Sequence, residues 1–266
     1  MESPEHKARR KALRNLETQV IRLRKIELEP AELERVNIRA LPMSLDDPLS
    51  IKPCFFDPYR ARPLSDPDPV RIERDFPDYD RPIDEDWVLS PIDGARAIEH
   101  YLGAYSVYCR RNVERNNTLL RRLWTCEDTA ERLFLWEFDE DDGQWEGAGI
   151  VDINSPGHEY PHLKCVILYD IDGDDDHLLR GELLAITRIM YRRMRWLSWI
   201  DHMVIPVLLF SFMGPQHGRI LHAHFDGREL VVRYSKLYDF RHQDNESLKL
   251  FAQWSLSSPM GKIKMK

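Results

Sequence analysis

The chain has 266 residues, of which 42% are hydrophobic and 31% charged, and its formal net charge is −7. These values are typical of a globular protein and argue against a protein that binds nucleic acid through its overall charge. No apolar run reaches the roughly 18 residues of a membrane span, and residues 1–15 are polar, so the sequence predicts neither a transmembrane helix nor a secretory signal.

Four cysteines are scattered through the chain, at positions 54, 109, 126 and 165. No two of them have the close spacing of a zinc ribbon or a redox motif. Such scatter is typical of reduced, buried thiols, so we expect a cytoplasmic or nuclear protein.

Residues 1–29 are predicted to form a basic amphipathic helix, with its helical pattern over residues 5–26. An apolar seam recurs at steps of three and four residues, at Leu13, Leu16, Val20 and Leu23. The helix also carries eight basic side chains, at positions 7, 9, 10, 11, 14, 22, 24 and 25. Three interpretations stay open: a nucleic-acid or nuclear-localisation patch, a short coiled coil, and a solvated helix that docks on its own domain, which we favour.

Residues 30–92 are predicted to form a proline-rich extended arm, because they hold 11 of the 17 prolines. Six aromatic residues interrupt the arm, namely Phe55, Phe56, Tyr59, Phe76, Tyr79 and Trp87. Disordered linkers are poor in aromatics. The arm is therefore expected either to pin these side chains onto the folded body or to offer them to a protein partner.

Residues 93–266 are predicted to form the folded core. Its first helix starts with Asp93 as a cap and presents an apolar face of Ile98, Tyr101, Leu102, Tyr105 and Tyr108. Two more helical segments follow, one containing Leu119, Leu120, Leu123 and Trp124, the other starting at Thr125 and continuing through Leu133, Phe134 and Trp136. An acidic, glycine-containing loop is predicted over 138–149.

The rest of the core has the predicted order β-α-β-β-β-α, with elements at 164–171, 177–198, 203–212, 219–225, 228–236 and 245–255. The long helix presents a stripe of Leu179, Leu183, Ile186, Met190 and Met194. Asp226-Gly227 marks a hairpin. The fold class is therefore α+β, a mixed α/β sandwich with a mainly antiparallel sheet of about four strands.

The predicted strand 219–225 places His222 and His224 on one face, and Glu229 follows just past the turn. Side chains of these types at this spacing can converge on one metal ion. The pattern resembles the first metal motif of the cupins. It departs from that motif at Gln216 and Lys236, where the cupins have glycine.

The order of helix, strands and hairpin also resembles the PD-(D/E)XK nuclease-like fold, in which carboxylates bind a divalent metal and a lysine assists the attacking water. That resemblance makes Glu182 and Asp226 candidate metal ligands and Lys236 the candidate lysine. Tyr234 stands where the second acid of the motif belongs, so the implied site is incomplete.

Structural interpretations compete with both sites. Asp226 before Gly227 is what a turn prefers, and the two histidines can lie on a face that is wet or covered by the arm. Residues 202–240 are also similar to a segment of uncharacterised proteins of filamentous fungi, which implies no activity. The sequence thus favours a non-catalytic interaction or scaffold protein, with a divergent metal-dependent hydrolase as the alternative.

Overall fold

The computed structural model describes residues 2–48, 51–64, 72, 74–80, 90–114, 124–125, 145–153, 159–261 and 263. The helices of this part are α1 (Pro4–Arg22), α2 (Pro30–Arg35), α4 (Pro91–Glu114), α6 (Arg180–Arg193) and α7 (Asn245–Ser255). The main sheet contains β2 (Ile38–Pro42), β4 (Trp124–Thr125), β5 (Trp145–Ile153), β6 (Leu163–Asp172), β8 (Val207–Gly214), β9 (His217–Phe225), β10 (Leu230–Tyr234) and β11 (Tyr238–Asp239). Two small ladders pair β1 (Glu27–Leu28) with β7 (Leu178–Leu179) and β3 (Phe56–Asp57) with β12 (Ser258–Pro259).

The main sheet is mixed, with the strand order β2-β10-β9-β8-β6-β5-β4 and β11 paired to β9. The pairs β10–β2 and β6–β8 are parallel, and the others are antiparallel. The predicted α+β class is confirmed. The predicted sheet of about four strands is too small, because β2 comes from the predicted arm and β5 from the predicted acidic loop.

Strand β5 overlaps a segment that the sequence predicts to be a loop because of its glycines. Gly147 and Gly149 indicate a loop, but in the structure the pairing of β5 with β6 shifts between them, as at a β-bulge. Trp124 and Thr125, predicted to be helical, form β4 beside β5. The remainder of the two predicted helices and the first part of the predicted acidic loop fall in 115–123 and 126–144, which lie outside the described residues.

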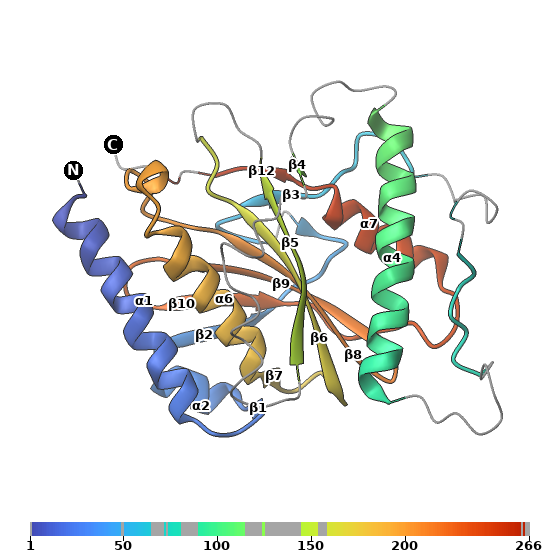
Figure 1. Ribbon diagram of the computed structural model, residues 1–266, viewed down its shortest axis with the longest axis horizontal. Coiled ribbons are helices and arrows are strands. Elements are labelled where there is room, and N and C mark those ends of the chain that lie inside the picture. Colours follow the sequence, from blue (N-terminus) through green and yellow to red (C-terminus); the bar gives the residue numbers. More distant parts are fainter. Residues whose placement is uncertain are drawn as a thin grey trace.

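Helices cover both faces of the sheet (Figure 1). One face packs against α6 and α1, and the other against α4 and α7. Alternate residues of each central strand therefore enter two different cores, which explains the continuous apolar runs in β6 and β8. In β9, for example, Leu221 belongs to the α6 side and Ile220 to the α4 side.

Helix α6 is buried on nearly every side, because it lies between the sheet and α1. Its predicted stripe is buried, and so are Leu184 and Ile189 on its other flank. The seam of α1 packs into the same core, and Arg188 of α6 donates to Glu17 of α1 over 2.9 Å. The basic helix is thus docked on its own domain, the interpretation that the sequence favours.

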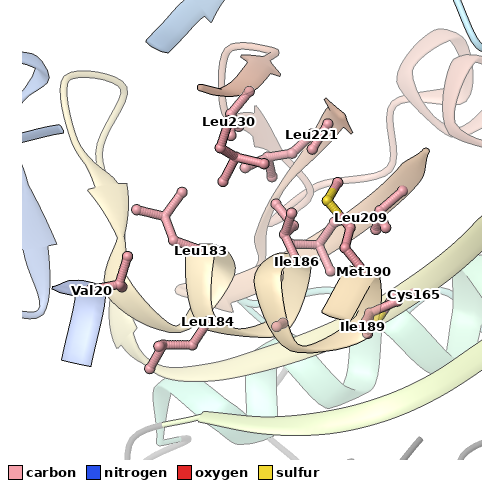
Figure 2. Close-up of a cluster of buried hydrophobic side chains, with 14 of the residues drawn as sticks. Val20, Cys165, Leu183, Leu184, Ile186, Ile189, Met190, Leu209, Leu221 and Leu230 are labelled. Atoms are coloured by element: carbon pink, nitrogen blue, oxygen red, sulfur yellow. The ribbon is translucent and has the colours of Figure 1, made fainter. Parts of the chain in front are cut away.

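Figure 2 shows Leu183 and Ile186 pointing from α6 toward Leu221 and Leu209 of the sheet. Leu183 is fully buried. Leu183→Ala is therefore expected to lower the free energy of unfolding by about 2–5 kcal/mol, because it removes buried methyl groups and leaves a cavity. Urea denaturation measures this loss, and a near-neutral result would contradict the packing of α6 on the sheet.

Four aromatics of the predicted arm, Phe55, Phe56, Tyr59 and Phe76, pack in or against the hydrophobic core on the α4 side. Phe76 packs edge-to-face on Tyr101 of α4 with ring centroids 5.1 Å apart. The strap, defined as residues 51–57, carries Phe55 and Phe56, which are both buried. Trp87 lies outside the described residues.

Two helix boundaries differ from the sequence expectation. Helix α4 begins at Pro91, after Ser90, whose carbonyl accepts the backbone N–H of Asp93. Asp93 therefore sits in the first turn rather than at the cap. Helix α6 covers only part of the predicted 177–198, because a short strand precedes it and a 3-10 turn follows at Leu197–Trp199.

Two whole-chain expectations concern cysteines and membranes. Cys54, Cys109 and Cys165 form no disulfide among the described residues, and Cys126 lies outside them. No helix in the described part of the chain is long and apolar enough to span a membrane.

Candidate functional site

The two histidines of β9 are buried under the strap. His222 is fully buried, and its Nε2 accepts the backbone N–H of Phe55 over 3.0 Å. The Phe55 ring stacks on His222 and lies 5.0 Å from the ring of His224. Of the two structural interpretations left open by the sequence, the covered face is the one observed.

The hydrogen bond from Phe55 requires a neutral imidazole at His222, because a protonated Nε2 has no lone pair to accept it. Burial, followed by the charges of His224 and Arg233, lowers the pKa of His222 to about 3. Burial and then Arg233 lower the pKa of His224 to about 4. His162, which packs edge-to-face on Phe56, has its pKa lowered to about 4, chiefly by burial. The three rings are buried against Phe55 and Phe56 of the strap, and we call His162, His222 and His224 the histidine cluster.

Glu229, the predicted carboxylate ligand beside His222 and His224, contacts a different residue. Glu229 pairs with Arg39 of β2 over 2.8 Å, at the surface. It does not come together with His222 and His224 in any group of described side chains that could hold a metal ion. The structure therefore gathers the two histidines of the cupin-like pattern without its carboxylate.

The predicted nuclease residues are also dispersed. Glu182 is fully buried and receives a bidentate pair from Arg219, over 2.8 and 2.7 Å. Asp226 follows the end of β9 and lies seven residues beyond Arg219, roughly 23 Å along the strand direction at about 3.3 Å per residue. Its Oδ1 accepts the backbone N–H groups of Arg228 and Glu229 as a turn cap. Lys236 is exposed, with its ammonium over the Tyr238 ring.

Two other groups of described side chains have donor atoms close enough for a metal ion: Glu27, Asp174 and His177, and Asp78, Asp80 and His242. Both are largely exposed. In the first, Asp174 Oδ1 already accepts the backbone N–H groups of residues 176 and 177, so it acts as a loop cap. An acidic side chain that caps a loop in this way needs no metal ion to explain its position.

A cavity lies on the opposite side of the sheet from α6, between α4, the sheet and the end of α7. Its volume is about 310 Å³, within the range of small-molecule sites. Helix α4 lines it with residues at helical spacing, from Glu99 to Arg110, which are about 16 Å apart at 1.5 Å per residue. Aromatic rings of Phe210, Phe212 and Phe251 form an apolar wall.

Two glycines keep this cavity open. A Cβ built on Gly149 of β5 meets no described atom within 4 Å, and one built on Gly103 of α4 meets only the Glu99 carboxylate at 3.9 Å. Neither glycine has a positive φ, so the missing side chains leave space rather than backbone freedom.

Lys164 of β6 is the buried polar residue of the cavity. Its Nζ donates to the carbonyl oxygens of Ser255 and Ser257, at the end of α7, over 2.6 and 3.0 Å. Burial, and after it the positive charge of Arg110, holds the pKa of the Lys164 amine well below its usual value. At the other end of the cavity, burial raises the pKa of Glu99.

Sequence reasoning missed this site for a definite reason. Lys164 opens the predicted strand 164–171 and is the one charged residue before a run of apolar ones. Lys164 lies on the face of β6 opposite the apolar residues that face α6. This arrangement becomes evident only when helices are known to cover both faces of the sheet. The glycine pair in β5 was a usable signal, since glycine in a strand marks a bulge or a close approach.

The chain was compared with protein-family models, with curated proteins and with solved structures, and none of the three comparisons found a match.

Proposed function

We propose that this protein binds a small, largely apolar molecule in the cavity between α4 and the sheet, and that it holds this molecule without hydrolysing it. The observation that carries the proposal is the cavity itself. It combines an aromatic wall, two open glycines and a few polar groups at fixed places. Pockets of this construction are the usual sites for small ligands.

The two functions that the sequence favours receive less support from the geometry. An interaction protein would present its aromatic anchors, but Phe55 and Phe56 are engaged by the histidine cluster. A metal-dependent hydrolase needs its carboxylates at one ion, whereas Glu182 is held by Arg219 and Asp226 lies at the far end of β9.

Filling the cavity is expected to abolish binding. In Gly149→Leu the new side chain enters the open space, so the protein should remain at least as stable, since burying a leucine contributes about 1.5–3 kcal/mol. Ligand-observed fluorine NMR with 4-fluorobenzyl alcohol should show line broadening with the unaltered protein and none with Gly149→Leu.

The matched control is Gln19→Leu, which adds the same side chain to the exposed side of α1, on the other face of the sheet. It should leave alcohol binding unchanged. Equal binding by the unaltered protein and Gly149→Leu would contradict the proposal, because the alcohol would then occupy another site.

A further inference from the structure

The cavity opens to the surface between α4 and β5, and Glu99 lies beside this opening. Gly103 and Val107 of α4 and Ala148 of β5 line the cavity and are also exposed, so a ligand can enter between these two elements. We call these three residues the mouth. Glu99 lies one helical turn before Gly103, on the same face of α4, and it lines the cavity as well.

Glu99 has one carboxylate oxygen beside the space that Gly103 leaves. A Cβ built on Gly103 would lie 3.9 Å from Glu99 Oε1. Apart from neighbouring backbone, no other described atom comes within 4 Å of that Cβ. The missing side chain therefore leaves room for a ligand group next to Oε1, where Gly103 lines the cavity.

The Glu99 carboxylate has nearby charges but no hydrogen-bonded partner among the described residues. Its Oε2 lies 3.7 Å from His100 Nε2, which is beyond hydrogen-bond distance, and Arg74 contributes a more distant positive charge. Burial is the largest influence on the pKa of Glu99 and raises it, because the charged form is partly desolvated. A cationic donor that reached Oε1 would therefore stabilise the ionised carboxylate.

We propose that the ligand of this cavity is an apolar primary amine, whose ammonium group pairs with Glu99 at the mouth while its apolar body lies against the apolar wall. An ammonium at the mouth keeps contact with water, so its desolvation costs little. The reverse placement is disfavoured, because Arg110 lines the cavity about 16 Å farther along α4 at 1.5 Å per residue. The inference rests on the proposed function, since the amine must occupy the same cavity.

Two matched ligands test the ammonium group. 4-Fluorobenzylamine and 4-fluorobenzyl alcohol share one skeleton and differ in the end group, which is charged in the amine at neutral pH. Fluorine NMR titration of the whole protein near pH 7 should show the amine binding at least about tenfold more tightly, because a charge-assisted hydrogen bond is roughly twice as strong as a neutral one. Benzylamine without fluorine should displace the fluorinated alcohol, which places both compounds in the same cavity.

Two substitutions of the same kind assign the preference to one carboxylate. Glu99→Gln keeps the size of the side chain but removes its charge, so amine binding should weaken by about tenfold while alcohol binding changes by less than about twofold. Glu34→Gln removes an exposed carboxylate of α2 that is not part of the cavity lining, and it should leave the preference intact. This comparison separates pairing with Glu99 from general attraction of the amine by the negative net charge of the protein.

The outcomes separate the two proposals. Equal binding of the amine and the alcohol, or a preference that persists in Glu99→Gln, would overturn the amine inference, and loss of alcohol binding in Gly149→Leu would then leave the cavity function standing. Tighter binding of 4-fluorobenzoate than of the amine would also overturn the amine inference, by assigning the charged end group to Arg110. Absence of binding by all three compounds would overturn both proposals, whereas an amine preference lost in Glu99→Gln and kept in Glu34→Gln supports both.

Discussion

Lowering the pH from about 8 to about 5 is expected to reduce the free energy of unfolding by about 6 kcal/mol, roughly 2 kcal/mol for each residue of the histidine cluster. The pKa values of His162, His222 and His224 lie at about 4, 3 and 4 in the folded protein, mainly because the rings are buried. An unfolded histidine titrates near 6.5.

The sign follows from which state binds the protons. Above about pH 6.5 all three rings are neutral in both states, and their full stabilising contribution is present. As the pH falls from 6.5 toward 4, the unfolded chain takes up protons that the folded chain excludes, so stability is lost across this window. Protonation of His222 would also remove the lone pair that accepts the Phe55 N–H.

Urea denaturation at several pH values between about 5 and 8 measures this effect as proton uptake on unfolding. His224→Gln should reduce the uptake by close to one proton, because it removes one member of the cluster. His100→Gln, which alters an exposed histidine of α4, is the matched variant. A stability that does not change over this range would contradict the burial of the cluster beneath the strap.

Arg219→Met is expected to lower the free energy of unfolding by about 3–5 kcal/mol, because it leaves the buried carboxylate of Glu182 without its partner. It also removes the donors to the carbonyl oxygens of Asp174 and His177. The loop before α6 therefore loses its attachment to β9.

A double variant separates the interaction between Glu182 and Arg219 from the contribution of each side chain alone. Glu182→Leu combined with Arg219→Met removes both buried charges, and it should cost less than Arg219→Met alone. Urea denaturation of Glu182→Leu, Arg219→Met and the double variant gives the coupling energy between the two side chains. If these variants all lost a similar and small amount of unfolding free energy, the result would contradict a structural ion pair between Glu182 and Arg219. A gain in stability of the unaltered protein with magnesium that Glu182→Leu abolishes would instead favour Glu182 as a metal ligand.

The sequence predicts this fold best where a residue pattern has only one structural explanation. The stripe on α6 and the alternation in β9 are correct because burial on a helix or a strand has a fixed period. His222 and His224 show the limit. Their shared face follows from the strand period, but whether water, a metal or the strap covers it depends on residues more than 160 positions away.

Long-range pairing accounts for the other differences. Strand β2 carries Pro42, and its weak pattern becomes a strand only because β10 offers a free edge. Glu182 has the spacing of a candidate metal ligand, but Arg219 reaches it from another element and takes both of its oxygens. The cavity arises where α4, the strands β5, β6 and β8, and the end of α7 come together, and none of these segments has a ligand motif of its own.

The most direct test is a crystal structure of the protein soaked with 4-bromobenzyl alcohol, using the anomalous signal of bromine to locate the ligand. The expected result is a bromine peak between α4 and β5, close to Gly149 and the Phe210–Phe251 wall, which disappears in Gly149→Leu. A peak confined to another part of the molecule, or none in a well-ordered soaked crystal, would contradict a ligand site in this cavity.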